Sequence, residues 1–448
     1  MPTTPSPSLP LPTASPDTSR VLVRGATVLT VDPELGVLPR GDVLVEGERI
    51  LAVGTDLSAA GATVIDATGM IALPGFVDAH VHAWEGQLRG SGPVVDFGGY
   101  LGLTAFGAGP RYSPDDVYAG TLATAVSALD AGITTVVDNA HNALTLEHAV
   151  AGVQALTDAG LRGVAAVGAP FGSPDDGVVA LAARLRESTS TPLVGVRAFG
   201  VHPSDRLWRA AAEAGLWVST ELGPHTPDLT AVMGALAASG LLGERHAFNH
   251  CYDLPEAVWR LVAESGAAVN LCPRSDAAFG LGSAVAPVEA ALACRGEVGL
   301  SGDNEISYAL SMFAEMQVLQ SRYRAEAWRR RAAGEQAETD ALTPERLLRM
   351  ATLGGAANAG LADRVGSLTP GKQADIVLLR ADSPRLAGVP DPMVAVTAYA
   401  DTADVDTVLV AGRLRKRYGR LVGRTLQTAQ ELAVESRERL AASTRTPA

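Results

Sequence analysis

The chain has 448 residues, with 36 Lys and Arg against 49 Asp and Glu, which gives a formal net charge of -13. This acidity argues against a nucleic-acid partner, because binding to a phosphate backbone requires clustered basic side chains. We find neither an apolar run of the roughly 18 residues that a membrane helix needs nor a signal-peptide pattern. Three cysteines are too few for a disulfide framework. We therefore expect a cytoplasmic protein without a membrane partner.

Two stretches of the chain have the texture of a β-sheet. Residues 1–19 are rich in Pro, Ser and Thr and predict a disordered leader. Residues 20–74 and again 361–425 contain short β-type runs separated by Gly, Asp and Pro turns. Neither stretch alone can bury both faces of a sheet, so we expect them to pair in one small, discontinuous β-sandwich domain. Residues 426–448 would form a C-terminal helix or tail.

The intervening residues 75–360 alternate between apolar strand-like runs and segments of helical period, such as 113–132 and 253–266. The apolar runs end near His82, Asp138, Gly168, Gly200, Glu221, His250, Cys272 and Asp303. Ser113, followed by a proline, is a good N-cap for one helix. Eight βα units predict an α/β fold, a (β/α)8 TIM barrel, with its active site at the C-terminal ends of the strands. Residues 85–112 are expected to form a loop over the barrel mouth.

Two histidines end the first strand of the predicted barrel. His80 and His82 are separated by one residue, and alternate residues of a strand share a face. Both imidazoles can therefore point from the top of the barrel toward one ion. The pattern, preceded by Pro-Gly-Phe-Val-Asp-Ala, predicts a metal site.

At this point the sequence resembles a known family. The first-strand segment is similar to the signature of the amidohydrolase superfamily, in particular its branch of cytosine, guanine and triazine deaminase-like enzymes. The likeness extends from about residue 20 to 425. It is carried by residues 73–90, 130–142, 249–254, 300–305, 366–379 and 408–413.

The resemblance implies roles for four residues. It implies that His80 and His82 ligate a metal, and that Asp303 ligates it and also accepts a proton from the water that the metal activates. It places His250 near the metal, where the ring either ligates or stabilises charge on the substrate. The implied cofactor is one divalent ion, with zinc expected first and manganese or iron possible.

The distribution of lysine excludes one type of metal centre. Some branches of the family bridge two metals with a carbamylated lysine on the fourth strand. Lysine occurs here only at Lys372 and Lys416, outside the predicted barrel, and the fourth strand contains none. We therefore expect a mononuclear site.

The fifth strand departs from the family pattern of a metal-binding histidine followed three residues later by a glutamate. Glu221 stands at the position of the histidine and Pro224 at that of the glutamate. Three interpretations remain open: Glu221 ligates the metal, Glu221 is a displaced acid/base group while His250 completes the metal shell, or the metal is weakly held or lost. His225 is a further candidate for the missing ligand, although it lies beyond a Gly-Pro turn.

Four residues are weaker candidates for contact with a substrate. Trp84 and Phe279 would line an apolar mouth, although aromatic residues in loops often only pack. His141 follows the second strand, where the family has residues that support the ligands or form the substrate wall. His202 ends the fourth strand, where it either contacts substrate or caps a turn.

These observations favour a metal-dependent hydrolase that cleaves a C–N bond in a small cyclic or heteroaromatic compound. The alternative is an enzyme of the same fold that catalyses elimination, isomerisation or cyclisation, for which activated water would be harmful. A third, non-enzymatic interpretation is a binding protein with a degenerate site. A small-molecule substrate and a homodimer or higher homo-oligomer are expected, and loop sequences do not identify the substrate.

Overall fold

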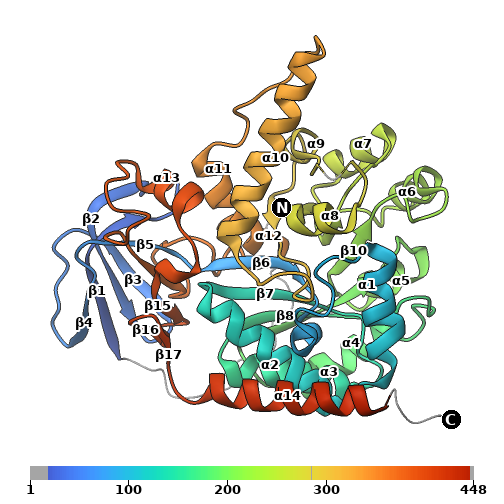
Figure 1. The fold of residues 1–448 in the computed structure, drawn as a ribbon, viewed down its shortest axis with the longest axis horizontal. Coiled ribbons are helices and arrows are strands. Elements are labelled where there is room, and N and C mark those ends of the chain that lie inside the picture. The colour runs from blue at the N-terminus through green and yellow to red at the C-terminus, as the bar shows by residue number, and fades with distance from the viewer. Residues whose placement is uncertain (1–18, 284, 444–448) are drawn as a thin grey trace.

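The computed structural model describes residues 19–283 and 285–443, so the leader expected over residues 1–19 lies almost entirely outside the described residues. The described chain forms a barrel of parallel strands and a second, separate mixed sheet, which lies to the left of the barrel in Figure 1. The C-terminal end of the long helix α10 (Met312–Ala332) projects away from both, whereas its first turns pack in the core. No helix in this part of the chain combines the length and the apolar character needed to cross a membrane.

The barrel contains eight parallel strands whose spatial order follows their order in the chain. They are β6 (Phe76–Val81), β7 (Ile133–Ala140), β8 (Arg162–Gly168), β9 (Val194–Gly200), β10 (Val218–Leu222), β11 (His246–His250), β12 (Ala268–Leu271) and β13 (Val298–Leu300). Hydrogen bonds from His82 N to Asp303 O (2.8 Å) and from Asp303 N to His80 O (3.0 Å) connect the first strand with the end of the last. The predicted eight-stranded barrel is thereby confirmed.

Helices follow the barrel strands and cover them. They are α2 (Pro114–Asp130), α3 (Leu146–Ala159), α4 (Val178–Ser188), α5 (Asp205–Glu213), α6 (Leu229–Ala238), α7 (Glu256–Ser265), α8 (Pro273–Phe279), α9 (Val288–Leu292), α11 (Pro344–Arg349) and α12 (Gly355–Asn358). The predicted cap is present: the Ser113 hydroxyl accepts from Asp116 N, and the Asp116 carboxylate accepts from Ser113 N. This reciprocal pair satisfies two backbone donors that the first turn of α2 leaves free.

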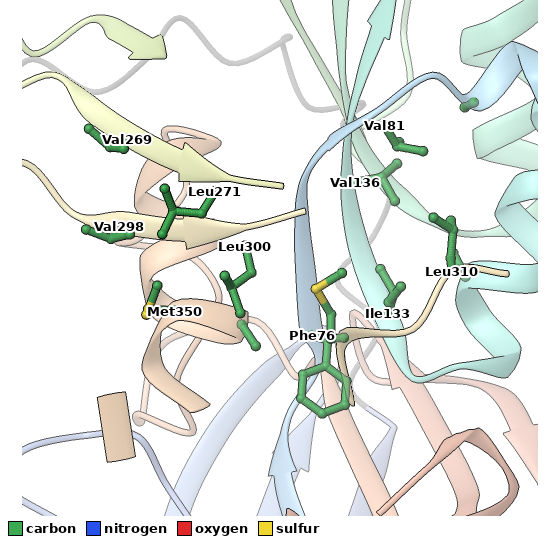
Figure 2. Packing of buried hydrophobic residues seen from close by; sticks show 14 of the residues in the cluster. Phe76, Val81, Ile133, Val136, Val269, Leu271, Val298, Leu300, Leu310 and Met350 are labelled. Atoms are coloured by element: carbon green, nitrogen blue, oxygen red, sulfur yellow. The ribbon is translucent and has the colours of Figure 1, made fainter. Parts of the chain in front are cut away.

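The barrel strands bury both faces, which is why they appear in the sequence as nearly continuous apolar runs. Figure 2 shows part of the outer layer, where Phe76 and Ile133 lie in the same core as Leu300 and Met350. Residues of the opposite face, such as Val77, form a separate core cluster with residues of α12 and the chain after it. Polar side chains are consequently free to occupy the C-terminal ends of the strands.

Strands from both ends of the chain form one continuous mixed sheet of nine strands. They are β1 (Arg20–Leu29), β2 (Val37–Glu46), β3 (Arg49–Gly54), β4 (Ala62–Asp66), β5 (Met70–Pro74), β14 (Ile376–Arg380), β15 (Val405–Val410), β16 (Arg413–Arg417) and β17 (Arg420–Leu421). The antiparallel pairing of β5 with β14 joins the N-terminal strands to the C-terminal ones. The short α13 (Pro392–Val394) precedes β15, and the last helix, α14 (Thr425–Ser443), packs along α2 at the bottom of Figure 1.

The segment after β6 is helical, contrary to the loop expected over residues 85–112. It contains η1 (Ala83–Leu88), α1 (Phe97–Leu103), η2 (Thr104–Ala108) and η3 (Gly109–Arg111). Asp96 caps α1 by accepting from Gly99 N at 2.8 Å. The apolar side chains of this segment pack in two small clusters, and this packing stabilises short helices that local sequence propensity does not specify.

Candidate metal centre and active site

Five polar side chains converge at the C-terminal ends of the barrel strands. His80 lies on β6 and His82 directly follows it, Glu221 lies on β10, His250 ends β11, and Asp303 follows β13. His80 Nε2 lies 2.7 Å from Asp303 Oδ1 and 3.6 Å from Glu221 Oε1. His250 Nε2 lies 3.4 Å from Glu221 Oε2, and His82 Nε2 lies 3.4 Å from Asp303 Oδ1. In two groups, His80, Glu221 and His250 and then His80, His82 and Asp303, the facing atoms all lie within 4.8 Å of one another.

The backbone at this site is strained. His250 (φ 64°), Cys251 (φ 57°) and Asp303 (φ 64°) all adopt the left-handed conformation, which L-residues with a side chain rarely adopt. Such residues cost about 1–3 kcal/mol each and cluster at functional sites, where the surrounding structure enforces them. Here two of them carry side chains of the cluster, which indicates that the strand ends are shaped to aim these groups.

The surroundings of the cluster favour the ionised form of Asp303 and the neutral form of His82. Burial opposes the ionisation of Asp303, but its hydrogen bond with His80 and the nearby His250 and His82 hold the pKa of Asp303 well below its usual range. Burial and the adjacent His80 lower the pKa of His82. The neutral form of His82, which is the form able to bind a metal, is therefore favoured.

Hydrogen bonds fix the ring orientation of the histidines. His82 Nδ1 donates to Asn139 O at 2.9 Å, so Nε2 carries the free lone pair and faces the cluster. The Asn139 side-chain amide in turn contacts His80 Nδ1. A partner on the far nitrogen is the usual arrangement for a metal-binding histidine.

Asp276 plays the same part for His250, and it is a residue that the sequence analysis missed. Its Oδ1 accepts from His250 Nδ1 at 2.7 Å. Burial lowers the pKa of His250, but Cys272 and Asp276 outweigh this effect and raise it well above its ordinary value. Ser275, from the same turn of α8, hydrogen-bonds to Asp303 Oδ2. The sequence signal that could have identified Asp276 is its position in the first turn of the helix that follows β12, the seventh strand of the barrel.

The donor set fits a divalent metal ion. Three imidazoles and two carboxylates are the ligands that zinc, manganese and iron take in proteins. Glu221 Oε2 is buried without a hydrogen-bond partner, which leaves an acceptor facing the cluster. His250 Nε2 lies 3.4 Å from this oxygen, which can therefore pair with the imidazolium or with a bound cation.

Four of these side chains, His82, Glu221, His250 and Asp303, form the floor of a pocket of about 100 Å³. Of the four predicted substrate contacts, His202 and Phe279 line this pocket. Trp84 and His141 are not among its lining residues; both are almost fully buried, and their rings pack against each other at 5.4 Å. The sequence analysis did not anticipate the contributions of Phe171, Tyr252, Ser275 and Leu281 to the lining.

Comparison with known proteins places these features in a family. The amidohydrolase family model matches residues 71–204 and 209–415. The chain belongs to the amidohydrolase family. A 5-methylthioadenosine/S-adenosylhomocysteine deaminase of Desulforudis audaxviator is 31% identical over 94% of this chain and 98% of its own length. The corresponding deaminase of Pelotomaculum thermopropionicum is 28% identical over 88% and 93%.

Solved structures of similar proteins include zinc-bound enzymes. The zinc complex of the atrazine chlorohydrolase of Arthrobacter aurescens TC1 is 25% identical, with a TM-score of 0.79, and the alignment covers 92% of this amidohydrolase and all of that chain. An adenosine deaminase of Xanthomonas campestris with bound zinc has a TM-score of 0.82 over 96% of this amidohydrolase and 100% of its own chain; at 23% identity this likeness shows the fold alone.

In this amidohydrolase the two lysines lie away from the site. Lys372 Nζ donates to Ala362 O, and Lys416 Nζ pairs with Asp130 at 2.7 Å. The fourth strand carries Arg197, whose guanidinium bonds to Ser219 Oγ and Asn358 O. A lysine-bridged pair of metals therefore has no residue to form it.

The unusual fifth strand places Glu221 in the cluster of candidate metal ligands. His225, the other candidate for the missing ligand, lines the pocket, but its ring nitrogens bond to Val201 O and the Tyr252 hydroxyl. His225 belongs to neither group of candidate metal ligands found among the described residues. The geometry is compatible with Glu221 as a ligand and as an acid/base group, so both remain predictions.

Proposed function

We propose that this amidohydrolase is a metal-dependent hydrolase that cleaves a C–N bond of a small heteroaromatic compound, by deamination or by opening of a cyclic amide. The observation that carries the proposal is the convergence of three imidazoles and two carboxylates in two groups of three, which share His80, at the floor of one pocket. Curated relatives with matching length are deaminases, which supports the same reaction class.

One divalent ion, zinc first, is the proposed cofactor. His80, His82 and Asp303 would hold it together with Glu221 or His250, which form a second group of facing atoms with His80. When bound, the ion lowers the pKa of a water molecule so that hydroxide is available near neutral pH. The absence of a lysine from the site supports a single ion rather than a bridged pair.

Asp303 and His250 are proposed to carry out proton transfer and charge stabilisation. Asp303, kept ionised by the surrounding histidines, is placed to accept the proton that the water loses and to pass it to the leaving amine. His250, held by Asp276, is placed to stabilise negative charge that develops on the ring. Both side chains are almost fully buried, and electrostatic interactions are stronger in such low-dielectric surroundings.

Metal removal tests this proposal. Protein stripped with a chelator should lose turnover of aminated heteroaromatic compounds and recover it when zinc is restored. His80→Ala should lower the zinc content of the purified protein. It should also lower kcat by at least about 100-fold, since a residue at the reacting centre contributes on this scale. A His80→Ala protein with normal zinc content and turnover would contradict the proposal.

One observation favours a non-hydrolytic reaction as the second candidate. Among the described residues that line the pocket, Glu221 and Asp303 are the only carboxylates. If both ligate the metal, no further carboxylate remains at the position where hydrolytic relatives are expected to carry one. Turnover in H₂18O separates the two reactions, because hydrolysis introduces 18O into the product and elimination, isomerisation or cyclisation does not.

Other expectations are not tested by the structure. A small molecule is the proposed substrate, and a homodimer or higher homo-oligomer and a cytoplasmic location stay predictions. Size-exclusion chromatography with light scattering measures the oligomeric state directly.

A further inference from the structure

The pocket above the candidate metal ligands has two chemically different parts. Its polar floor consists of four of the cluster side chains, His82, Glu221, His250 and Asp303. Its upper part is formed by four aromatic rings, here called the aromatic wall: Phe97, Tyr100, Phe171 and Phe279. Leu281 and Tyr252 extend this apolar surface.

The rings of the aromatic wall contact one another although they come from three separate segments. Phe97 and Tyr100, both on α1, are stacked with centroids 6.1 Å apart, and Tyr100 meets Phe279 of α8 at 4.9 Å. Phe171, from the connection between β8 and α4, meets Phe97 edge to face at 6.4 Å. Tyr100 cannot swing away, because its hydroxyl donates to the buried Glu85 carboxyl at 2.7 Å. The wall therefore presents a preformed apolar surface to an occupant.

No arginine or lysine lines this pocket within the described part of the chain. Two arginines on neighbouring segments are engaged elsewhere: Arg274 Nε binds the buried Glu315 carboxylate at 2.5 Å, and Arg89 Nη2 binds Glu305 at 2.7 Å. The carboxylates that line the pocket, Glu221 and Asp303, lie on the floor together with the imidazoles of His82 and His250. Two further imidazoles line it outside the cluster, and their rings already have partners: His202 Nδ1 bonds to Thr226 Oγ1, and His225 bonds to Val201 O and the Tyr252 hydroxyl.

We propose that this pocket selects an uncharged, planar heteroaromatic ring with apolar substituents, and rejects substrates that carry a carboxylate or phosphate beyond the ring. The inference rests on the proposed function, whose substrate class it narrows. The reacting carbon faces the floor, and the substituents of the ring lie against the aromatic wall.

The physical reason is the cost of desolvating an anion. A neutral ring gains favourable contact with the aromatic rings, which prefer offset-stacked and edge-to-face neighbours. An anionic substituent placed there would lose its water without gaining a cation or a set of donors. An uncompensated buried charge of this kind lowers affinity by roughly 100-fold or more.

The test uses pairs of compounds that share a ring, one with an uncharged substituent and the other with a substituent that carries a carboxylate. One pair is 5′-methylthioadenosine and S-adenosylhomocysteine, which share adenine and differ in an amino-acid tail. A second pair is an aminotriazine with an ethylamino substituent and the same ring with a carboxymethylamino substituent. Binding to the zinc-loaded protein is measured by calorimetry, and kcat/KM is measured separately.

We expect the neutral member of at least one pair to bind roughly 100-fold more tightly than its charged partner. Equal or tighter binding of the charged member in both pairs, or no binding of any of the four compounds, overturns the proposal. Selective binding of neutral rings without any turnover would refute the proposed hydrolysis but support this selectivity. Turnover of both members of a pair at equal kcat/KM would support the proposed hydrolysis but refute this selectivity.

A variant places the missing cation in the wall. Phe171 is only partly buried and lies on a connection, so Phe171→Arg should be accommodated by the fold. We expect it to raise affinity for the carboxylated member by at least about 10-fold and to weaken binding of the neutral one. Phe171→Leu, which removes the same ring without adding charge, is the matched control and should not improve binding of the anion. A gain in Phe171→Leu equal to that in Phe171→Arg would contradict the electrostatic argument.

Discussion

At the scale of single residues, the orientation of His250 depends on Asp276, which accepts from its Nδ1 and is itself almost fully buried. Asp276→Asn retains the shape of the side chain but removes its charge. We expect zinc affinity and kcat/KM to fall about 10–100-fold, the usual effect of losing such a supporting carboxylate. Competition with a chromophoric chelator measures the affinity.

Asp253→Asn is the matched control for this substitution. Asp253 lies three residues after His250, is exposed, and adopts a left-handed conformation that asparagine also tolerates. It does not line the pocket. Equal losses in the two variants would show that the effect of Asp276→Asn is not due to its bond with His250.

The role of Glu221 can also be decided by a pair of substitutions at that residue. If Glu221 ligates the metal, Glu221→Gln should lower zinc affinity by at least about 10-fold, whereas Glu221→His, which restores the ligand typical of the family, should retain zinc. If Glu221 is an acid/base group, Glu221→Gln should keep its zinc and lose about 10²–10⁴-fold in kcat. Metal analysis together with steady-state kinetics distinguishes the two roles.

At the scale of elements, helix α2 illustrates how much a local signal can determine. Ser113 and Asp116 form a reciprocal capping box, and proline occupies the first turn. Ser113→Ala should lower the free energy of unfolding by about 1 kcal/mol, because a backbone donor loses its partner. Ser127→Ala, in the last turns of the same helix, is the control and should change it by less than 0.5 kcal/mol, roughly the effect of a neutral surface substitution. Urea denaturation measures both.

The strands of the barrel were equally predictable in position, whereas the segment between β6 and α2 was not. Each strand buries both faces, so apolar runs mark it clearly. The helices around Phe97 and Tyr100 depend instead on packing against Phe279, a contact with a distant part of the chain. Local periodicity carries no signal of such a contact.

At the scale of the whole molecule, a buried ion pair connects the barrel with the terminal sheet. Arg162 of β8 forms two hydrogen bonds, at 3.0 and 3.2 Å, to Asp375, which directly precedes β14. Both side chains are almost fully buried. Asp375→Ala would leave the guanidinium without a counter-charge, so the free energy of unfolding should fall by about 3–5 kcal/mol.

The control for this prediction is an exposed pair. Glu256 and Arg260 face each other at 3.8 Å on the surface of α7. Glu256→Ala should change stability by less than about 1 kcal/mol, because solvent screens such pairs. If Asp375→Ala were no more destabilising than Glu256→Ala, the buried pair would not contribute to holding the two sheets together.

The sequence alone determined the barrel, the joining of β-strands from the two chain ends in a separate part of the molecule, and the position of His80 and His82 at the end of the first strand, because strand periodicity and turn residues act locally. That these strands form one continuous sheet of nine came from the structure. Only the tertiary structure decided that Asp276 supports His250 and that the ring of Phe171 meets Phe97 in the aromatic wall. These contacts join segments that barrel closure brings together. A sequence pattern records which residues share a face of one strand, but the meeting of side chains from different strands depends on the closed geometry of the barrel.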